Sequence, residues 1–286
     1  MGADSSGHAV VEVAGLGFTL VPTGADDDPT TIGVDNPEAT AEGIASRVEA
    51  NPHAATLLAS VLLRTGSLDV VTALEVESLA YSVLLAGPEF RHWMRARGPR
   101  PLPPPAAEPV RLKRDADLLR VTLNRPERRN AYGAQVRDAL VDGLAVGLAD
   151  PALRIVLDGA GPAFCAGGDL DEFATTPDPV TAHLIRTRAG AALPLHQLAA
   201  RLEVRLHGPC IGAGIELPAF AGRVTAAAGA TFRLPELSMG LIPGAGGTVS
   251  LPRRIGPQRT LYLALSGVEL DLDTALAWGL VDALSD

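Results

Sequence analysis

The hydrophobic residues between positions 37 and 97 recur every three or four residues, which is the spacing of an apolar face on a helix. Proline and glycine interrupt this pattern, and the residue before a proline is disfavoured inside a helix. We therefore predict three or four helices in this stretch. The predicted breaks are at Asn51-Pro52, Thr65-Gly66 and Gly87-Pro88.

The pattern is different before position 37. Residues 8–21 alternate apolar side chains with glycines, which predicts a short hairpin. Residues 26–37 are acidic and rich in turn-forming residues, so we predict a loop there. The whole region from 1 to 97 is therefore expected to be small and mainly helical, and we assign no chemistry to it.

Residues 98–109 form a proline-rich stretch that resists both helix and sheet. This stretch is the clearest domain boundary in the chain. We predict three parts: an N-terminal region at residues 1–97, a linker at residues 98–109 and a core at residues 110–286.

Segments typical of strands and helices alternate after the linker. Short apolar or alternating runs predict strands, and longer amphipathic runs predict helices. The alternation predicts an α/β core. The predicted strands are 110–114, 118–123, 153–157, 203–206 and a last one at 281–286, the predicted helices are 131–148 and 179–198, and a short helix and a strand pair are expected between positions 216 and 236.

Composition narrows the class of protein. The chain has 286 residues, of which 47% are hydrophobic and 20% charged, as in a soluble globular protein with a large core. A formal charge of −9 argues against non-specific binding of nucleic acid, which needs clustered positive charge. Two cysteines cannot form a disulfide framework. The first residues lack the features of a signal peptide, and no apolar run reaches the roughly 20 residues of a membrane span, so we predict a cytoplasmic protein.

A glycine-bordered turn, Gly212-Ala213-Gly214, precedes Glu216 and is the first candidate for chemistry. A dinucleotide-binding fingerprint needs a third glycine at position 217, which is Leu217, and no glycine turn is followed by the Lys-Ser/Thr of a P-loop. The alternative is an oxyanion hole, in which backbone N–H groups at a helix start bind a developing negative oxygen. We favour the oxyanion hole.

Four motifs in this order resemble the enoyl-CoA hydratase/isomerase (crotonase) superfamily over residues 110–286. The resemblance implies an α/β spiral of ββα repeats that binds acyl-CoA thioesters, with coenzyme A as part of the substrate and no other cofactor or metal. It also implies a homotrimer or homohexamer. The motifs are Leu123–Ala131, Ala163–Leu170, His207–Leu217, and Pro235-Glu236 followed by Ile242–Thr248.

The resemblance also implies roles for individual residues. The backbone amides of Gly168 and Ala213 would form the oxyanion hole, and Glu216 and Glu236 would be the two acid–base residues. Asp169 is also expected to cap the turn that follows it. The residues expected to bind substrate or coenzyme A are Arg128, Ala166, Gly167, Asp169, Leu170, Gly212, Pro243 and Gly244.

The residues themselves support a functional Glu216. A lone glutamate usually lies on a solvated helix face, but Glu216 sits between Ile215 and Leu217, where burial without a role would be costly. Cys165 and Cys210 are interpreted as structural thiols, since no base is evident beside them.

The chain departs from the family pattern in three places, of which one is Pro218 soon after Glu216, where a proline in the first turn of a helix is tolerated. Gly222 stands where the family usually has an aspartate, and the sequence stops before the helical extension that usually ends the family's core. We expect the N-terminal helices to take over the covering role of that extension.

The predicted function is that of an acyl-CoA lyase that reversibly hydrates a 2-enoyl-CoA to a 3-hydroxyacyl-CoA through an enolate. The alternatives within the superfamily are a double-bond isomerase, a thioester hydrolase and an arylacetyl-CoA dioxygenase. An alternative of a different class is a non-catalytic subunit that binds acyl-CoA or assists assembly. Simple isomerases of the family commonly keep only the second glutamate, so the presence of both favours hydration.

Overall fold

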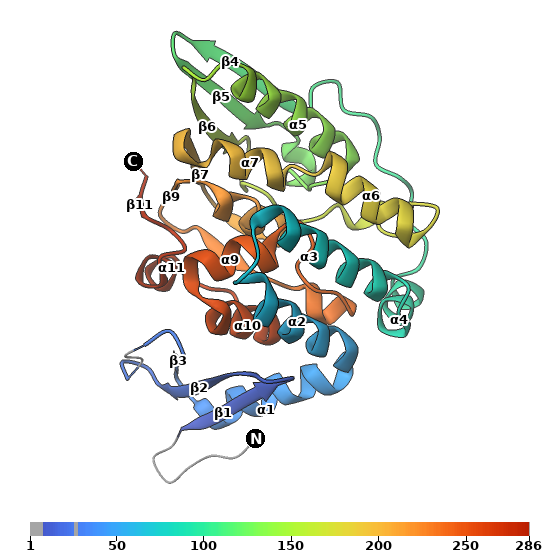
Figure 1. Cartoon of the computed structure of the whole chain (residues 1–286), viewed down its shortest axis with the longest axis vertical. Helices are drawn as coiled ribbons and strands as arrows, with labels where there is room; N and C mark the ends of the chain where they lie inside the picture. The colour runs from blue at the N-terminus through green and yellow to red at the C-terminus, as the bar shows by residue number, and fades with distance from the viewer. Residues whose placement is uncertain (1–7, 26–27, 286) are drawn as a thin grey trace.

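A mostly parallel sheet of six strands forms one wall of the molecule, with helices packed against it (Figure 1). The computed structural model describes residues 8–25 and 28–285, so the first seven residues and positions 26–27 of the predicted loop lie outside the described part. The strand order is β11-β9-β7-β6-β5-β4, and only β4 runs antiparallel to its neighbour. The strands are β4 (Val110–Asp115), β5 (Leu118–Leu123), β6 (Arg154–Gly159), β7 (Leu202–Leu206), β9 (Arg223–Ala226) and β11 (Ala283–Leu284).

A second, smaller sheet gives the core its spiral course. It pairs β8 (Pro209–Ile211) in parallel with β10 (Thr231–Arg233), and a bridge from Cys165 to Cys210 extends it. The chain passes from β7 to β8 and then from β9 to β10, so each turn contributes a strand to both sheets. The predicted strand pair between positions 216 and 236 is therefore wrong: β9 and β10 both form, but they belong to different sheets.

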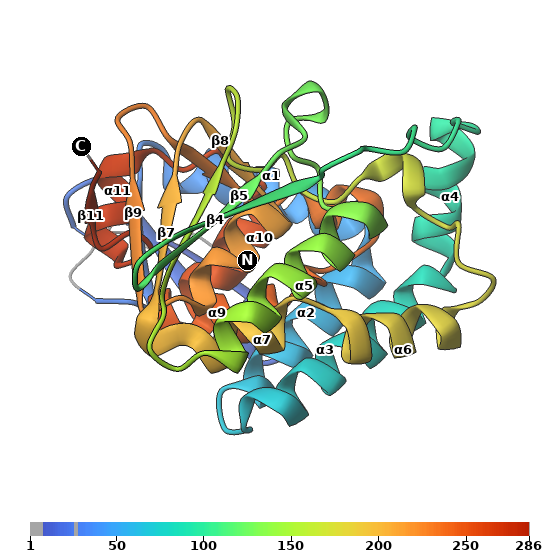
Figure 2. The ribbon, with the colours of Figure 1, turned by 90° about the horizontal axis from the view of Figure 1, so that it is seen from above.

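Helices fill the space beside these sheets (Figure 2). The single helix predicted at residues 179–198 is two helices, α6 and α7. The break falls at Gly190, where a Cβ would lie 2.3 Å from the carbonyl oxygen of Arg186. The core helices are α5 (Ala134–Ala149), α6 (Pro179–Ala189), α7 (Ala192–Leu198), α8 (Ala213–Glu216), α9 (Gly247–Ile255), α10 (Pro257–Ser266) and α11 (Leu272–Trp278); the 3-10 turns are η1 (Pro126–Arg128), η2 (Leu170–Glu172), η3 (Ala199–Arg201), η4 (Pro218–Phe220) and η5 (Glu236–Met239).

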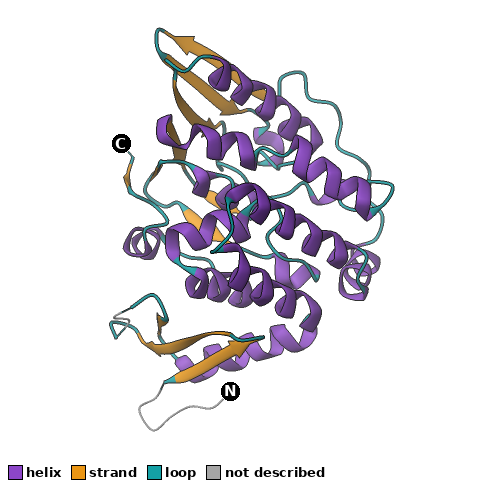
Figure 3. Ribbon diagram, viewed as in Figure 1, coloured by secondary structure: helices purple, strands orange, loops and turns teal. Residues whose placement is uncertain are grey.

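The N-terminal region begins with a small sheet (Figure 3). The predicted hairpin forms from β1 (Ala9–Val13) and β2 (Leu16–Pro22). The prediction of a loop at residues 26–37 is wrong in part, because β3 (Thr31–Val34) pairs in parallel with β2. This pairing is a tertiary contact, and the four residues of β3 are too few to show a pattern that predicts a strand.

Four helices follow this sheet, as the periodicity and its three breaks predicted. Asn36 and Asp69 cap the first and third of them, accepting hydrogen bonds from the backbone amides of Ala39 and Thr72. The first, second and fourth of these helices each begin with a proline. The helices are α1 (Pro37–Ala50), α2 (Pro52–Thr65), α3 (Val70–Leu85) and α4 (Pro88–Arg97).

The N-terminal helices pack directly on the core. In the ribbon α2 and α3 lie beside α9, and α3 also lies along α6 (Figure 1). Thr65 donates a buried hydrogen bond of 2.8 Å to the carbonyl of Thr248, and Arg253 donates to the carbonyl of Thr65 at 3.0 Å. The buried apolar residues of both regions form one continuous cluster. The proposed division into an N-terminal region, a linker and a core stays a prediction.

Within the described residues, no single helix is long and apolar enough to cross a membrane. Helices α3 and α4 together satisfy those criteria of length and composition, but they are bent by 61° at the break between them.

We expect the shared cluster to make the chain unfold as one unit. Leu58 of α2 is 1% exposed, and Leu58→Ala should lower the free energy of unfolding by about 2–5 kcal/mol. Leu63→Ala on the same helix is the control, because Leu63 is 47% exposed and its loss should cost no more than about 0.5 kcal/mol. Urea unfolding followed by circular dichroism measures both. Two separate transitions, with only the first affected by Leu58→Ala, would contradict a shared core.

Candidate functional site

A cavity of about 530 Å³ lies between the N-terminal helices and the core. Its walls come from α3, α4 and α6, from the loop after β6, and from the turn before α9. Leu74, Tyr81 and Leu85 of α3 and Trp93 of α4 line it, so the added helices cover this cavity. All four residues predicted to carry the chemistry line it as well: Glu216, Glu236, Gly168 and Ala213.

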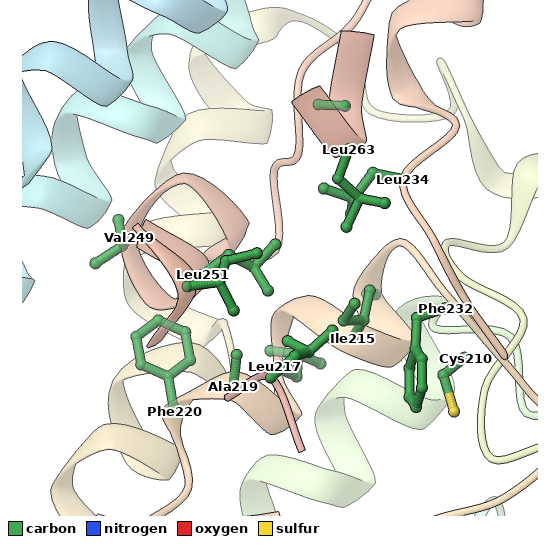
Figure 4. Packing of buried hydrophobic residues seen from close by; sticks show 14 of the residues in the cluster. Cys210, Ile215, Leu217, Ala219, Phe220, Phe232, Leu234, Val249, Leu251 and Leu263 are labelled. Atoms are coloured by element: carbon green, nitrogen blue, oxygen red, sulfur yellow. The ribbon is translucent and has the colours of Figure 1, made fainter. Parts of the chain in front are cut away.

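Glu216 ends the single turn of helix α8. Its neighbours Ile215 and Leu217 pack into the apolar cluster (Figure 4), while the Glu216 side chain borders the cavity and is 2% exposed. Its Oε2 atom accepts hydrogen bonds from the backbone amides of Ala245 at 2.7 Å and Gly247 at 3.0 Å. No hydrogen bond within the described chain reaches its Oε1 atom.

Glu236 is the first residue of η5 and is 8% exposed. Its Oε2 atom is buried without a hydrogen-bond partner among the described residues. Its Oε1 atom lies over the glycine turn, where a Cβ on Gly212 would come within 2.5 Å of it. Gly212 has a φ of 51°, so both the backbone conformation and the close approach require glycine there. Glu236 is thus packed against the turn that precedes Glu216.

Burial raises the proton affinity of both carboxylates. Burial raises the pKa of Glu236 to about 8. Burial also raises the pKa of Glu216 well above its ordinary value, and the charge of Glu236 raises it further. The amides of Ala245 and Gly247 oppose this shift, because they bind the charged form.

The backbone amides of Gly168 and Ala213 have no acceptor among the described residues. Tyr132 bridges to Gly168 in parallel, but the bonds of that bridge run from the Tyr132 amide to the Gly167 carbonyl and from the Asp169 amide to the Tyr132 carbonyl. The Gly168 amide therefore points to the other side. Ala213 opens α8, so its amide is one of the unpaired donors at a helix start. Both residues border the cavity, and this arrangement can hold an oxyanion.

The residues predicted to bind substrate divide into two groups. Six of them line the cavity: Ala166, Gly167, Asp169, Leu170, Gly212 and Gly244. Pro243 and Arg128 do not. Pro243 is buried under the turn at Gly247, where an added Cβ would lie 2.7 Å from its own Cβ.

Arg128 is occupied by the loop after β6. It donates hydrogen bonds to both carboxylate oxygens of Asp169 at 2.9 and 2.6 Å and to Asp171 at 2.8 Å. Asp169, 2% exposed, also accepts from the amide of Asp171 and so caps η2. These contacts give Arg128 a part in shaping the loop, and its contact with coenzyme A stays a prediction.

Glu77 lies within residues 37–97, the stretch to which we assigned no chemistry. This glutamate of α3 is 2% exposed and lines the same cavity. The helical spacing could have predicted that Glu77 is buried, because it follows Ala73 by four residues and precedes Leu84 by seven, and both are buried apolar residues of the same helix. Glu75, by contrast, falls on the exposed face.

The thiols of Cys165 and Cys210 are buried, and burial raises the pKa of both, that of Cys165 to about 12. A thiol that stays protonated is a poor nucleophile. Among residues 8–25 and 28–285, no group of three or more His, Cys, Asp or Glu side chains could hold a metal ion.

The raised pKa of Glu236 predicts how stability changes with pH. The unfolded chain loses this proton near pH 4.5, whereas the folded chain keeps it to about pH 8. The unfolded state therefore binds fewer protons in this range, and the free energy of unfolding should fall as pH rises from 4.5 to 8. Glu236→Gln should flatten the slope, and the exposed Glu75→Gln should not. Urea unfolding at several pH values measures this, and equal slopes in wild type and Glu236→Gln would refute it.

Comparison with known proteins extends these findings beyond the fold. The family model described as enoyl-CoA hydratase/isomerase matches residues 113–285, which is more than half of the chain. The 2,3-dehydroadipyl-CoA hydratase of Escherichia coli K12 is 34% identical over 171 residues, covering 59% of this chain and 66% of that protein. The 1,2-epoxyphenylacetyl-CoA isomerase of the same organism is 34% identical over 169 residues, covering 57% and 64%. The chain thus spans just under two thirds of the length of these curated relatives.

Solved structures agree with the sequence match. The enoyl-CoA hydratase from Thermoplasma volcanium GSS1 gives a TM-score of 0.55 at 32% identity, covering 63% of this chain and 73% of that chain. A crystal structure from Thermobifida fusca YX, solved in complex with acetoacetyl-CoA, gives a TM-score of 0.56 at 26% identity, covering 62% and 73%. The family resemblance and the predicted α/β fold are confirmed, while residues 1–112 lie outside the family match. The chain belongs to the enoyl-CoA hydratase/isomerase, or crotonase, family.

Proposed function

We propose that the protein adds water reversibly to a 2-enoyl-CoA and forms a 3-hydroxyacyl-CoA. One observation carries the proposal: two buried carboxylates and two unbonded backbone amides border the same cavity. Hydration of an enoyl thioester needs a base for water, an acid for C2, and donors for the thioester oxygen. The site offers one group for each of these tasks.

The amides of Gly168 and Ala213 would bind the thioester oxygen. Attack at C3 pushes the electrons of the double bond toward this oxygen, which becomes the oxygen of an enolate. Donors already fixed in place stabilise that charge without rearranging, and the loss of one such donor typically costs about 10²–10³ in rate.

Glu216 and Glu236 would carry the protons. We assign Glu216 the role of base, because its Oε1 atom accepts no hydrogen bond from the described chain and two amides bind its charged form, which opposes the rise in its pKa caused by burial. It would take a proton from water as the water oxygen bonds to C3. Glu236, whose raised pKa keeps it protonated near neutral pH, would give its proton to C2. The pair begins and ends the cycle with one proton, and the net change is the addition of one water molecule.

Isomerisation is the second candidate, because the matching family model is described as enoyl-CoA hydratase/isomerase. Shifting a double bond also passes through an enolate, but it moves a proton between carbons and needs no water-activating base. The two reactions therefore differ in their dependence on Glu216. Thioester hydrolysis, oxygenation of an arylacetyl-CoA and non-catalytic binding stay the remaining alternatives.

The first test follows the loss of enoyl-thioester absorbance with a short panel of 2-enoyl-CoAs. Glu216→Gln and Glu236→Gln should each lower turnover by about 10²–10⁴-fold, the usual contribution of a general acid or base. Binding of the thioester should persist in both variants, because the amides of Gly168 and Ala213 are unchanged.

The outcomes separate the reactions. Loss of turnover in both variants supports hydration with the two assigned roles. A wild-type protein that binds the thioesters without hydrating them refutes the proposal. A wild-type protein that shifts a double bond, and does so equally well as Glu216→Gln, points to isomerisation instead.

We also propose that the protein assembles as a homotrimer or homohexamer, which is what the family resemblance implies. Sedimentation equilibrium of the full chain should then give a mass of about three or six times 29.6 kDa. A monomeric mass at the concentrations used for turnover would contradict this proposal.

A further inference from the structure

The turn that holds Glu216 is held from its other side by a second carboxylate. Four consecutive backbone amides, those of residues 245 to 248, all donate to glutamates. Ala245 and Gly247 donate to Glu216, at 2.7 and 3.0 Å. Gly246 and Thr248 donate to Glu77, at 2.7 and 2.8 Å. Along the chain the four amides donate alternately to Glu216, which belongs to α8, and to Glu77, which belongs to α3.

Glu77 has both of its oxygens in use. Oε1 accepts from the amide of Gly246, and Oε2 accepts from the amide and, at 2.7 Å, from the hydroxyl of Thr248. Glu216 leaves its Oε1 atom without such a bond. Glu77 is therefore placed to hold backbone, and Glu216 is placed to meet a ligand.

Helix α3 also contacts this turn one helical turn further on. A Cβ on Gly244 would lie 2.3 Å from the ring of Tyr81, so that ring rests directly on the backbone before the four amides. The guanidinium of Arg186 from α6 stacks on the Tyr81 ring, 4.7 Å from its centre. Ser78 and Ser82 of α3 accept hydrogen bonds from Arg186 and so tie α6 to α3. The turn is thus supported by a packed pair of helices.

We propose that Glu77 is a positioning residue for the reaction: by binding the amides of Gly246 and Thr248, it fixes the turn whose alternate amides orient Glu216. This inference rests on the proposed acid–base role of Glu216. It makes α3, which lies outside the family match, a working part of the site.

Electrostatics adds a second effect of Glu77 on the same residue. The charge of Glu77 raises the pKa of both Glu216 and Glu236. Other charged or titratable groups around Glu77 are Arg186 and His183 of α6 and Tyr81 of α3; His183 bonds to Ser78 at 2.9 Å. Burial raises the pKa of Glu77 itself to about 7, so its charge acts on the other two glutamates as pH rises through that value. Removing this charge should therefore lower the proton affinity of Glu216, and the acid limb of the kcat/KM profile should move to lower pH.

The decisive variant is Glu77→Gln, with Glu75→Gln as its matched control. A carboxamide keeps one acceptor, but its NH₂ group would face an N–H donor at Gly246 or Thr248, so the turn has to shift. We expect kcat to fall by about 10- to 100-fold with little change in KM, since small displacements of a reacting group carry losses up to roughly 10²-fold. Glu75 is exposed on the same helix, and Glu75→Gln should match the wild type.

Amide hydrogen exchange followed by NMR tests, without any turnover, whether Glu77 fixes the turn. In Glu77→Gln, exchange should accelerate at Ala245 and Gly247, which bind Glu216 and make no contact with Glu77 through their amides. The inference would be overturned if Glu77→Gln had the same kcat and pH profile as Glu75→Gln and the same exchange rates at these two amides.

Two further outcomes remain decisive. If the wild type hydrates no enoyl-CoA, the proposed function fails, and the exchange experiment still decides whether Glu77 holds the turn. If Glu77→Gln does not fold, Thr248→Val replaces it, because this isosteric change removes one of the three donors to Glu77. Accelerated exchange at Ala245 and Gly247 in Thr248→Val then supports the proposal that Glu77 fixes the turn, and unchanged exchange overturns it.

Discussion

Four consecutive backbone amides bind two buried carboxylates, and the arrangement of the whole cavity depends on this contact. Burying a carboxylate away from water is costly unless hydrogen bonds replace its hydration. Glu77 receives three such bonds and Glu216 receives two, and hydrogen bonds to charged groups contribute about 1.5–3 kcal/mol each. The turn from Gly244 to Thr248 therefore supports both Glu77, whose two oxygens accept its hydrogen bonds, and Glu216, whose Oε1 atom accepts none from the described chain.

Glu236 differs from the other two carboxylates in the way it is held. No amide of the 245–248 turn reaches it, and one of its oxygens is buried with no partner in the described chain. Such a group favours its protonated form. Glu216, by contrast, has two backbone amides that bind its charged form and oppose the rise in its pKa. The difference arises from the backbone around each side chain, since the side chains themselves are identical.

The N-terminal helices are integrated into the core of this family member. Helix α3 packs against α6 and α9, and its side chains form part of the cavity wall. In many enzymes a cavity between two structural units gathers its residues from both. Here Glu77 and Tyr81 come from outside the family match, and Gly168 and Ala213, which border the same cavity, come from inside it. The cavity is therefore lined jointly by the family core and by a region that lies outside the family match.

The sequence by itself determined the features that depend on neighbouring residues. Proline and glycine pairs placed the breaks between α1, α2, α3 and α4, and local motifs located Glu216, Glu236 and the two glycine turns. Features that depend on distant contacts were decided only by the tertiary structure. Strand β3 forms because it pairs with β2, and β9 and β10 do not pair because each belongs to a different sheet. Glu77 gains its meaning from amides 169 and 171 residues away, and no local pattern can report a hydrogen bond across that distance.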